Sequence, residues 1–430
     1  MLNKTPLELN GDFRDALDNL EKTNRSMFIT GRAGTGKSTL LQLFRRTTKK
    51  KMVVLAPTGI AALNVKGQTI HSFFGFPPRF ITARDIHKSA ARKWFKKIEV
   101  MVIDEISMVR ADLLDAIDRS LRLHRDNPLP FGGLQMVFIG DLFQLPPVIA
   151  TEAERQLFGT AYETPYFFSA NALRDFEMDM LELRKVYRQE NRRFLRLLDA
   201  VRLNQADWED LEDLNTRHQP HFEAGPGHIT LTPFNAIADR INQRELANLP
   251  GPAHHFTATI EGEFDPRLYP TDALLKLKQG AQVMFIKNDP EGNFVNGTIG
   301  QVSHLDGETI KVLTDEPGSP SEIEVWPMEW EILRYKPARE NPEEIEAEVV
   351  GRFEQYPLKL AWAVTIHKSQ GKTFDRVIID MGRGAFEFGQ TYVALSRCRT
   401  LEGIVLKQLL KPSDILVDDR IVEFYEQYLS

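Results

Sequence analysis

The sequence predicts an α/β fold with two parallel sheets and a small antiparallel β-barrel inserted into the second half of the chain. Short apolar segments alternate with helical stretches early in the chain and again near its end, which is typical of parallel sheets covered on both faces. The length of 430 residues exceeds what one hydrophobic core usually serves, so several domains are expected. Between residues 250 and 350, turns rich in Pro, Gly and Asp separate short apolar runs, as in small antiparallel barrels.

The first domain is expected to span residues 1–165, with a small wedge-like insertion at about residues 64–80. Residues 9–23 are predicted to form a helix, because Phe13, Leu17 and Leu20 recur on one helical face. Four apolar segments are predicted to be buried strands, and a further helix follows a glycine-rich segment. The strands are residues 27–30, 52–56, 100–104 and 135–140, and the helix is residues 37–46.

The second domain is expected in two parts, residues 166–249 and 351–430, on either side of an insert at residues 250–350. Strands are predicted in the domain and in its insert from short apolar runs bounded by turns. In the domain these are residues 228–232, 358–364 and 376–380, and in the insert residues 281–287, 297–303 and 309–313.

Composition and charge exclude several classes of protein. No apolar run approaches the roughly 18 residues of a membrane span, and the first residues carry no signal sequence. The single cysteine, Cys398, excludes an internal disulfide framework and favours a reducing cytoplasm. The net charge is −6, yet residues 1–150 hold 23 Lys and Arg against 14 Asp and Glu, a net of +9. This asymmetry is compatible with a local polyanion site, although surface charge is usually only solvated.

The strongest motif is the segment Gly-Arg-Ala-Gly-Thr-Gly-Lys-Ser at residues 31–38, which fits the pattern of a phosphate-binding loop. It follows an apolar strand and precedes a helix, which is the context that the motif requires. Glycines let backbone N–H groups turn toward phosphate oxygens, and the helix N-terminus adds partial positive charge. Lys37 can reach the β- and γ-phosphates, and the Ser38 hydroxyl can bind Mg²⁺. A glycine-rich turn without a ligand is the alternative.

Two acids end the predicted strand at residues 100–104. Asp104 is placed to hold the water shell of Mg²⁺, and Glu105 to orient and deprotonate an attacking water. Alone, such a pair is usually a solvated turn. Together with the phosphate loop it indicates nucleotide hydrolysis.

Several further segments, in order along nearly the whole chain, resemble one family of helicases. They are residues 56–62, 67–74, 130–135, 140–147, 186–189, 365–371 and 392–397. With Lys37 and Asp104-Glu105 they are similar to the motifs of the Pif-type (petite integration frequency) 5′-to-3′ DNA helicases of superfamily 1, relatives of the RecD-like enzymes. The chain resembles a bacterial form reduced to the helicase core.

The resemblance implies two RecA-like domains, a Src-homology-type barrel, and ATP bound with Mg²⁺ in the cleft between the domains. It implies that Gln144 senses the γ-phosphate and that Arg188 and Arg397 act as arginine fingers from the second domain; the alternative for each arginine is a surface ion pair. Many superfamily members read adenine with an N-terminal Gln that is missing here, so Asn10 is the candidate for a base contact. The expected nucleotide-binding set is Asn10, Gly34, Thr35, Gly36, Lys37, Ser38, Thr39 and Gly371.

A track for single-stranded DNA is expected on loops that follow strands. Exposed aromatics at Phe73 and Phe74 could stack on bases, or could form a local core instead. The other candidates are family positions or lie where an N–H or hydroxyl could meet a phosphate. They are Thr58, Gly59, His71, Thr365 and His367.

The expected function is ATP-driven, 5′-to-3′ translocation on single-stranded DNA with duplex unwinding, by a monomer without a membrane association. Junctions with duplexes or G-quadruplexes and RNA–DNA hybrids are further substrates that the family implies, with roles in replication, repair, recombination or telomere-type maintenance. A nucleotide-state switch without unwinding and an RNA-directed helicase are the alternatives. The expected location is the bacterial cytoplasm, in association with the nucleoid.

Overall fold

The computed structural model describes residues 11–88, 90–149, 151–189, 191–307, 309–314, 321–338 and 345–429. Within these ranges the chain divides into two compact units. The P-loop unit comprises residues up to 186 together with residues 331–351 and the C-terminal residues from 419. The second unit comprises residues 187–330 and 352–418. In the part of the chain covered by these ranges, no helix has the length and apolar character needed to cross a bilayer.

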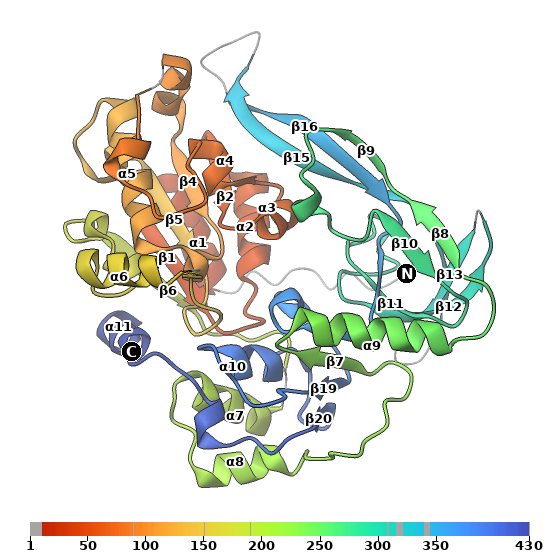
Figure 1. Cartoon of the computed structure of the whole chain (residues 1–430). Helices are drawn as coiled ribbons and strands as arrows, with labels where there is room; N and C mark the ends of the chain where they lie inside the picture. The colour runs from red at the N-terminus through yellow and green to blue at the C-terminus, as the bar shows by residue number, and fades with distance from the viewer. Residues whose placement is uncertain are drawn as a thin grey trace. The chain divides into compact units, whose positions relative to one another are not determined.

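The P-loop unit is built on a six-stranded sheet with the order β3-β2-β4-β5-β1-β6, in which every neighbouring pair is parallel (Figure 1). The strands β1, β4 and β5 are buried along their whole length, as expected of central strands in a covered parallel sheet. The six strands are β1 (Ser26–Gly31), β2 (Met52–Ala56), β3 (Gln68–Thr69), β4 (Val100–Ile103), β5 (Gln135–Ile139) and β6 (Met178–Leu183).

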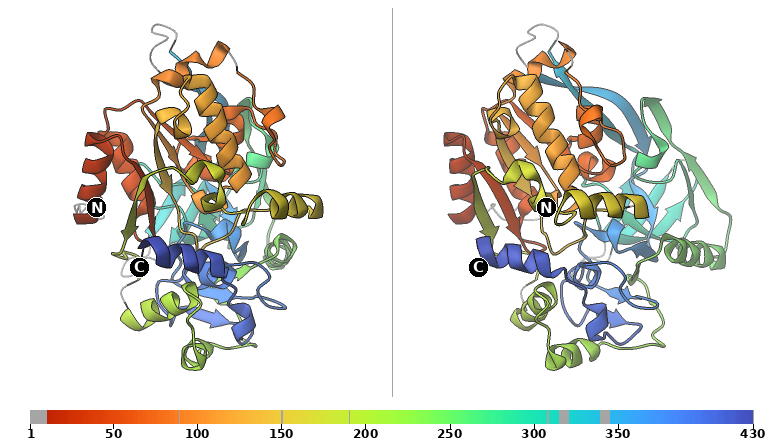
Figure 2. Two further views of the ribbon diagram at one scale, coloured as in Figure 1. Left: turned by 90° about the vertical axis from the view of Figure 1, so that its left-hand side faces the viewer. Right: turned by 60° about the vertical axis from the view of Figure 1, so that its left-hand side comes forward.

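Helices cover both faces of this sheet. Figure 2 shows α1 and α2, in red, on one face and α5, in orange, on the other. Phe13 of α1 and Leu40 and Phe44 of α2 join Val102 and Ile139 of the sheet in one buried core. The helices of the unit are α1 (Gly11–Lys22), α2 (Lys37–Thr47), α3 (Gly59–Asn64), α4 (Ile70–Phe74), α5 (Ala111–Arg125), α6 (Glu152–Ala161) and α11 (Asp419–Leu429).

The second unit contains a four-stranded parallel sheet with the order β18-β7-β19-β20. Because its strands are parallel, their carboxyl ends share one edge of the sheet, where ligands of open α/β sheets usually bind. The strands are β7 (Ile229–Thr232), β18 (Ala363–Thr365), β19 (Val377–Ile379) and β20 (Ile404–Leu406), and the helices are α7 (Arg192–Arg202), α8 (Trp208–Asn215), α9 (Asn235–Asn248) and α10 (Gln390–Leu395).

The inserted region forms antiparallel structure around its own core. The largest sheet has the order β14-β13-β12-β11-β17, and Val283, Val312 and Leu358 lie in its core with Phe285 and Phe294. Smaller sheets have the orders β10-β8 and β15-β16-β9, and closure of these strands into a barrel stays a prediction. The strands are β8 (His254–Thr257), β9 (Thr259–Gly262), β10 (Leu274–Leu277), β11 (Gln282–Phe285), β12 (Ile299–Leu305), β13 (Ile310–Thr314), β14 (Ser321–Val325), β15 (Met328–Pro337), β16 (Ile345–Gln355) and β17 (Leu358–Leu360).

The expected α/β class with parallel sheets is confirmed, but three details differ from the sequence analysis. The strand β6 adds to the first sheet beyond the expected boundary at residue 165. The single strand expected over residues 358–364 is two strands, since β17 pairs with β11 in the antiparallel sheet and β18 pairs with β7 in the parallel sheet. The helix α11 belongs to the P-loop unit rather than to the second unit. Neither β6 nor α11 is predicted from the sequence, and the two partners that divide residues 358–364 lie far away in the chain.

Candidate nucleotide and nucleic-acid sites

The phosphate loop connects β1 to α2 in a conformation that depends on its glycines. Gly34 and Gly36 have φ values of 83° and 88°, in the left-handed region that favours glycine. A Cβ atom at Gly36 would lie 2.9 Å from the Phe13 ring, so the close approach of α1 also requires glycine there. Gly36 is the N-cap of α2, and no side chain caps that end of the helix. The N-terminal N–H groups and partial positive charge of α2 are therefore available to a phosphate.

Lys37 lies at the first position of α2, and its ammonium group is held inside the loop. Lys37 Nζ donates hydrogen bonds to Gly31 O at 2.6 Å and to Arg32 O at 3.0 Å. The neighbouring Thr35 is buried, and its hydroxyl donates to the same Arg32 carbonyl. These contacts aim the lysine across the loop, as binding of the β- and γ-phosphates requires.

Asp104 and Glu105 follow the carboxyl end of β4, next to β5 in the same sheet. Burial, and secondarily the Glu105 carboxylate, raise the pKa of the Asp104 carboxyl to about 7, and Lys37 opposes the shift. The electrostatic influence of Lys37 on Asp104 agrees with a position of this acid near the phosphate loop. Glu105 has φ 51° and ψ 45°, a left-handed conformation that is uncommon for a residue other than glycine. Such strain is concentrated at functional sites, which fits the predicted role of Glu105 as the base.

Two oxygen donors near the loop fit Mg²⁺. Ser38 is exposed in the first turn of α2, and Asp104 supplies a carboxylate. Mg²⁺ prefers such hard oxygen ligands and usually takes the remainder from water and substrate phosphates. The described residues contain no group of three or more His, Cys, Asp or Glu side chains that could hold a metal by itself.

Gln144 follows β5 and is held by an acid that the sequence analysis did not single out. Gln144 Nε2 donates to Asp141 Oδ2 at 3.1 Å, and both side chains are buried. A Cβ atom at Gly140 would lie 2.9 Å from Ile106 Cγ2, so glycine brings this segment against the turn that carries Glu105. The signal for Asp141 was its position directly after Gly140 at a strand end.

The second unit brings Arg188 and Arg397 together. Arg188 is half-buried, and its guanidinium donates to Ser396 O at 3.2 Å. Arg397 is 1% exposed and donates to Val393 O in α10, to Ser369 O and Lys372 O, and to the Ser396 hydroxyl. The alternative of a surface ion pair is therefore wrong for Arg397, whose guanidinium is satisfied by main-chain carbonyls. Burial lowers the pKa of Arg188, and the nearby Arg397 lowers it further.

Gly371 and Lys372 extend this cationic cluster. Arg188 Nη2 lies 3.5 Å from Gly371 O, and Gly371 has a left-handed φ of 74°. Burial, together with the nearby Lys359 and Arg397, lowers the pKa of Lys372 to about 8. Neighbouring cations whose pKa values are lowered by one another are stabilised by an anion. The cluster of Arg188, Lys372 and Arg397 therefore fits a phosphate group. Lys372 was missed by the sequence analysis, although it directly follows the motif that ends at Gly371.

The expected DNA-track residues of the P-loop unit differ in their environments. Thr58 is the N-cap of α3, where its hydroxyl accepts a hydrogen bond from Ala61 N at 3.3 Å, and Gly59 is buried behind it. His71 is partly buried in α4. Burial lowers the pKa of its imidazole, and Arg110 lowers it further, so the neutral form is favoured. A DNA contact by these three residues stays a prediction.

Phe73 and Phe74 are not exposed, so the expectation of aromatics free to stack on bases is wrong. They are 5% and 3% exposed, and Phe73 stacks on Phe95 with ring centroids 5.1 Å apart. Trp94 and Tyr335 pack against the edge of the same cluster. The local-core alternative is the correct one, because burying these large rings gives more free energy than leaving them in water.

The remaining track candidates lie at the carboxyl edge of the parallel sheet in the second unit. Thr365 ends β18, is 3% exposed, and accepts a hydrogen bond from Lys368 N at 3.4 Å. His367 is partly exposed, and its Nε2 lies 3.1 Å from the Glu387 carboxylate. Of this pair, His367 is the side chain that a strand of DNA could reach. Asn10, the candidate for adenine contact, lies outside the described residues.

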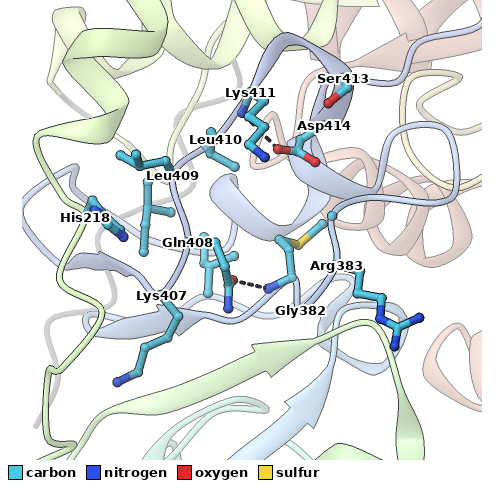
Figure 3. Close-up of a pocket in the computed structure, with 14 residues that line it drawn as sticks. His218, Gly382, Arg383, Lys407, Gln408, Leu409, Leu410, Lys411, Ser413 and Asp414 are labelled. Carbon is cyan, nitrogen blue, oxygen red and sulfur yellow. Dashed lines mark hydrogen bonds between the residues drawn. The ribbon is translucent and has the colours of Figure 1, made fainter.

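A cavity of about 410 Å³ opens at the same edge, beyond β19 and β20 (Figure 3). Its wall is fixed by Gln408, whose Oε1 accepts from Met381 N at 3.0 Å, and by Asp414, which accepts from Lys411 N at 2.9 Å. Figure 3 shows the Arg383 side chain pointing away from Lys411 and Asp414. Loops that follow β19 and β20 thus continue the edge on which His367 lies.

Comparison with known proteins decides the family. A model described as PIF1-like helicase matches residues 8–208. The ATP-dependent DNA helicase Pif1 of Bdellovibrio bacteriovorus is 33% identical over 434 residues, which cover 98% of this chain and 92% of the relative. The chain belongs to the PIF1-like helicase family. The resemblance drawn from the motifs is thereby confirmed.

Solved structures of PIF1-like helicases agree with this assignment. The crystal structure of Bacteroides sp Pif1 in complex with ADP-AlF4 is 36% identical, with a TM-score of 0.90 and coverage of 98% of this chain and 97% of that chain. The structure of Bacteroides Pif1 bound to ssDNA is also 36% identical, with a TM-score of 0.68 and the same coverage.

Proposed function

We propose that this chain is an ATP-dependent DNA helicase that couples ATP hydrolysis to 5′-to-3′ translocation on single-stranded DNA. The observation that carries the proposal is the phosphate loop, which lies on β1 at the carboxyl edge where β4 and β5 present Glu105 and Gln144. Membership of the PIF1-like helicase family supports the reaction and the nucleic acid, because relatives are named ATP-dependent DNA helicases and one was crystallised with ssDNA.

In this proposal, different residues of the P-loop unit have different roles in ATP hydrolysis. Lys37 and the N-terminus of α2 bind the phosphates, and Gly34, Thr35, Ser38 and Thr39 shape the loop around them. Glu105 orients a water and accepts its proton, while Gln144, positioned by Asp141, senses the γ-phosphate. Bound through Ser38 and Asp104, Mg²⁺ would neutralise charge on the β- and γ-phosphate oxygens.

The second unit supplies cations to the transferring phosphoryl group. In this proposal Arg188 contacts the γ-phosphate when the nucleotide site is complete, and Arg397 holds the loop that carries Ser396 beside it. A planar guanidinium matches the charge that develops on the phosphoryl oxygens. Hydrolysis and the grip on DNA are thereby coupled, since His367 and Gly371 flank the same short segment.

Substrates beyond single-stranded and duplex DNA are a finer part of the proposal. G-quadruplex junctions and RNA–DNA hybrids follow from the family resemblance alone, as do action as a monomer and association with the bacterial nucleoid. We infer that the motor is the same for each, because phosphate contacts along a single strand carry no sequence information.

Strand displacement on tailed duplexes tests the proposed function. Duplexes with a single-stranded 5′ tail should be unwound in the presence of ATP and Mg²⁺, and duplexes with a 3′ tail should not. The Lys37→Ala variant is the control, because it should lose nucleotide binding or hydrolysis while keeping the fold. Unwinding only from 3′ tails would reverse the polarity. ATP hydrolysis that single-stranded DNA does not stimulate would favour a nucleotide switch instead.

A further inference from the structure

Two exposed phenylalanines stack on each other in the second unit. The rings of Phe234 and Phe386 have centroids 5.2 Å apart and an interplanar angle of 22°. Phe234 is 44% exposed and Phe386 is 56% exposed, so each ring keeps a wide surface in water. The two residues come from different loops, and the pair therefore forms a flat aromatic surface that the core does not use.

Phe234 and Phe386 lie at the carboxyl edge of the parallel sheet in the second unit. Phe234 lies two residues after the end of β7, the strand between β18 and β19, and Phe386 lies in the loop that follows β19. Thr365 ends the neighbouring β18, in register with Thr232 of β7. The aromatic surface therefore lies along the edge that also carries His367.

Phe234 also occupies a position where another residue type would stabilise the helix better. It is the N-cap of α9, and no side chain accepts a hydrogen bond at that end of the helix. Asn, Asp, Ser and Thr are strongly preferred at an N-cap, and Phe offers no acceptor. An exposed ring at this position is therefore poorly explained by the stability of α9.

The loop that carries Phe386 is held in place before any ligand arrives. Phe386 N donates to Gln390 Oε1 at 3.2 Å, and Ala385 N donates to Asp414 Oδ1 at 3.4 Å. The next residue, Glu387, is held on His367 at 3.1 Å. A surface fixed in this way binds a flat ligand with little loss of conformational entropy.

Two exposed cations suited to a phosphate backbone lie near Phe386 and His367 in the sequence. Arg383 is exposed in the loop of Phe386, three residues earlier, and Lys368 is exposed beside His367. Stacking surfaces combined with such cations are the general means of binding single strands without sequence preference. A flat aromatic surface, a fixed loop and flanking cations together identify the occupant as a nucleobase.

We propose that Phe234 and Phe386 form a base-stacking platform for single-stranded DNA. The inference rests on the proposed function and deepens it, because it assigns base contacts to a unit whose expected contacts, Thr365 and His367, are polar. One base stacks on the open face of the pair, while Arg383 and Lys368 contact phosphates on either side.

Binding of two strands with equal charge tests the platform. The first is a dye-labelled oligothymidine, and the second has the same length but abasic sugars in place of nucleotides. Phe234→Ala and Phe386→Ala should each weaken binding of oligothymidine by roughly 5- to 150-fold, the equivalent of stacking one base. Binding of the abasic strand should not change. Phe386→Trp should keep the wild-type affinity, and Trp208→Ala is the matched control, since Trp208 is 71% exposed on α8.

The outcomes separate the platform from the proposed function. If the wild type binds oligothymidine and both alanine variants bind it equally well, the platform is overturned and the helicase proposal stands. If the variants lose affinity for both strands to the same extent, the phenylalanines only support the loop, and the platform is again overturned. If the wild type binds neither strand, the proposed function fails first.

Discussion

Glu105 shows how one residue can be positioned by backbone strain. Its left-handed φ of 51° directs the side chain away from the course of β4, immediately after the buried Asp104. Gly140 permits this turn, because any Cβ there would collide with Ile106. A general base must lie within hydrogen-bond reach of the water that it activates, and the proposed role of Glu105 requires this turn to provide that reach.

Replacing Glu105 by Gln should keep ATP binding and slow hydrolysis by roughly 10²–10⁴-fold, the usual contribution of a general base. The amide keeps the size and backbone conformation of the side chain but cannot accept the proton. Binding of a fluorescent ATP analogue and DNA-stimulated phosphate release measure the two effects. Hydrolysis at the wild-type rate would show that Glu105 is not the base.

The two arginines of the second unit differ in what their environments allow. The buried Arg397 guanidinium donates to the carbonyl oxygens of residues 369, 372 and 393, whereas Arg188 is half-buried and contacts two carbonyl oxygens, at 3.2 and 3.5 Å. The structure therefore favours Arg188 as the residue that reaches a phosphate and Arg397 as the residue that positions the loop.

Arg188→Ala should lower DNA-stimulated kcat by about 10³–10⁵-fold, the range for an arginine finger, without changing the free energy of unfolding by much. Arg397→Ala should lower the free energy of unfolding by about 1–3 kcal/mol or more, because the carbonyl groups of residues 369, 372 and 393 lose a hydrogen-bond donor. Chemical denaturation and ATPase assays on both variants check the contrast. Equal stability of Arg397→Ala and the wild type would contradict the positioning role.

At the scale of elements, Tyr335 of strand β15 forms hydrogen bonds with the first sheet. Tyr335 Oη accepts a hydrogen bond from Val54 N of β2 at 3.2 Å, and Tyr335 N donates to Gln68 Oε1 at 3.0 Å. The ring packs against Phe73 with centroids 6.1 Å apart. One side chain from residue 335 therefore satisfies a buried donor in β2 and closes the aromatic cluster around α4.

Tyr335→Phe should lower the free energy of unfolding by about 1–3 kcal/mol, because it leaves the Val54 N–H buried without its acceptor. The ring and its packing remain, so the loss belongs to the hydroxyl. Urea denaturation measures it. Tyr428→Phe, at a ring that is 49% exposed, is the matched control and should change little. A neutral Tyr335→Phe would mean that another group satisfies Val54.

At the scale of the whole molecule, the last helix, α11, belongs to the same unit as α1. Phe424 of α11 stacks on Phe168 with centroids 4.5 Å apart, and Tyr425 Oη donates to Glu182 Oε1 at 2.7 Å. Phe143, next to Gln144, also packs against Tyr425. The last helix therefore supports the sheet that carries the phosphate loop.

Phe424→Ala should destabilise the P-loop unit by up to about 1.5–3 kcal/mol, the value of fully burying a large apolar side chain, because Phe424 is partly buried. ATP stabilises the unit that binds it, so the affected thermal transition should be the one that ATP raises. Calorimetry with and without ATP measures this, and Glu423→Ala on the exposed face of α11 is the control. If Phe424→Ala instead lowers the temperature of a thermal transition that ATP does not shift, the assignment of α11 to the P-loop unit is contradicted.

The sequence by itself predicted the phosphate loop and the acids that follow β4, because glycine positions, a lysine and strand-end acids act through local geometry. It also identified the family, and the strands that it predicted lie within a few residues of observed ones apart from residues 358–364, but several strands, among them β6 and β16, were not predicted. The tertiary structure decided what depends on distant partners. It buried Phe73 and Phe74 through Trp94 and Tyr335, divided residues 358–365 between two sheets, and returned α11 to the P-loop unit. An apolar pattern predicts that a residue will be buried. Which residues it packs against is decided only when segments far apart in the chain come together.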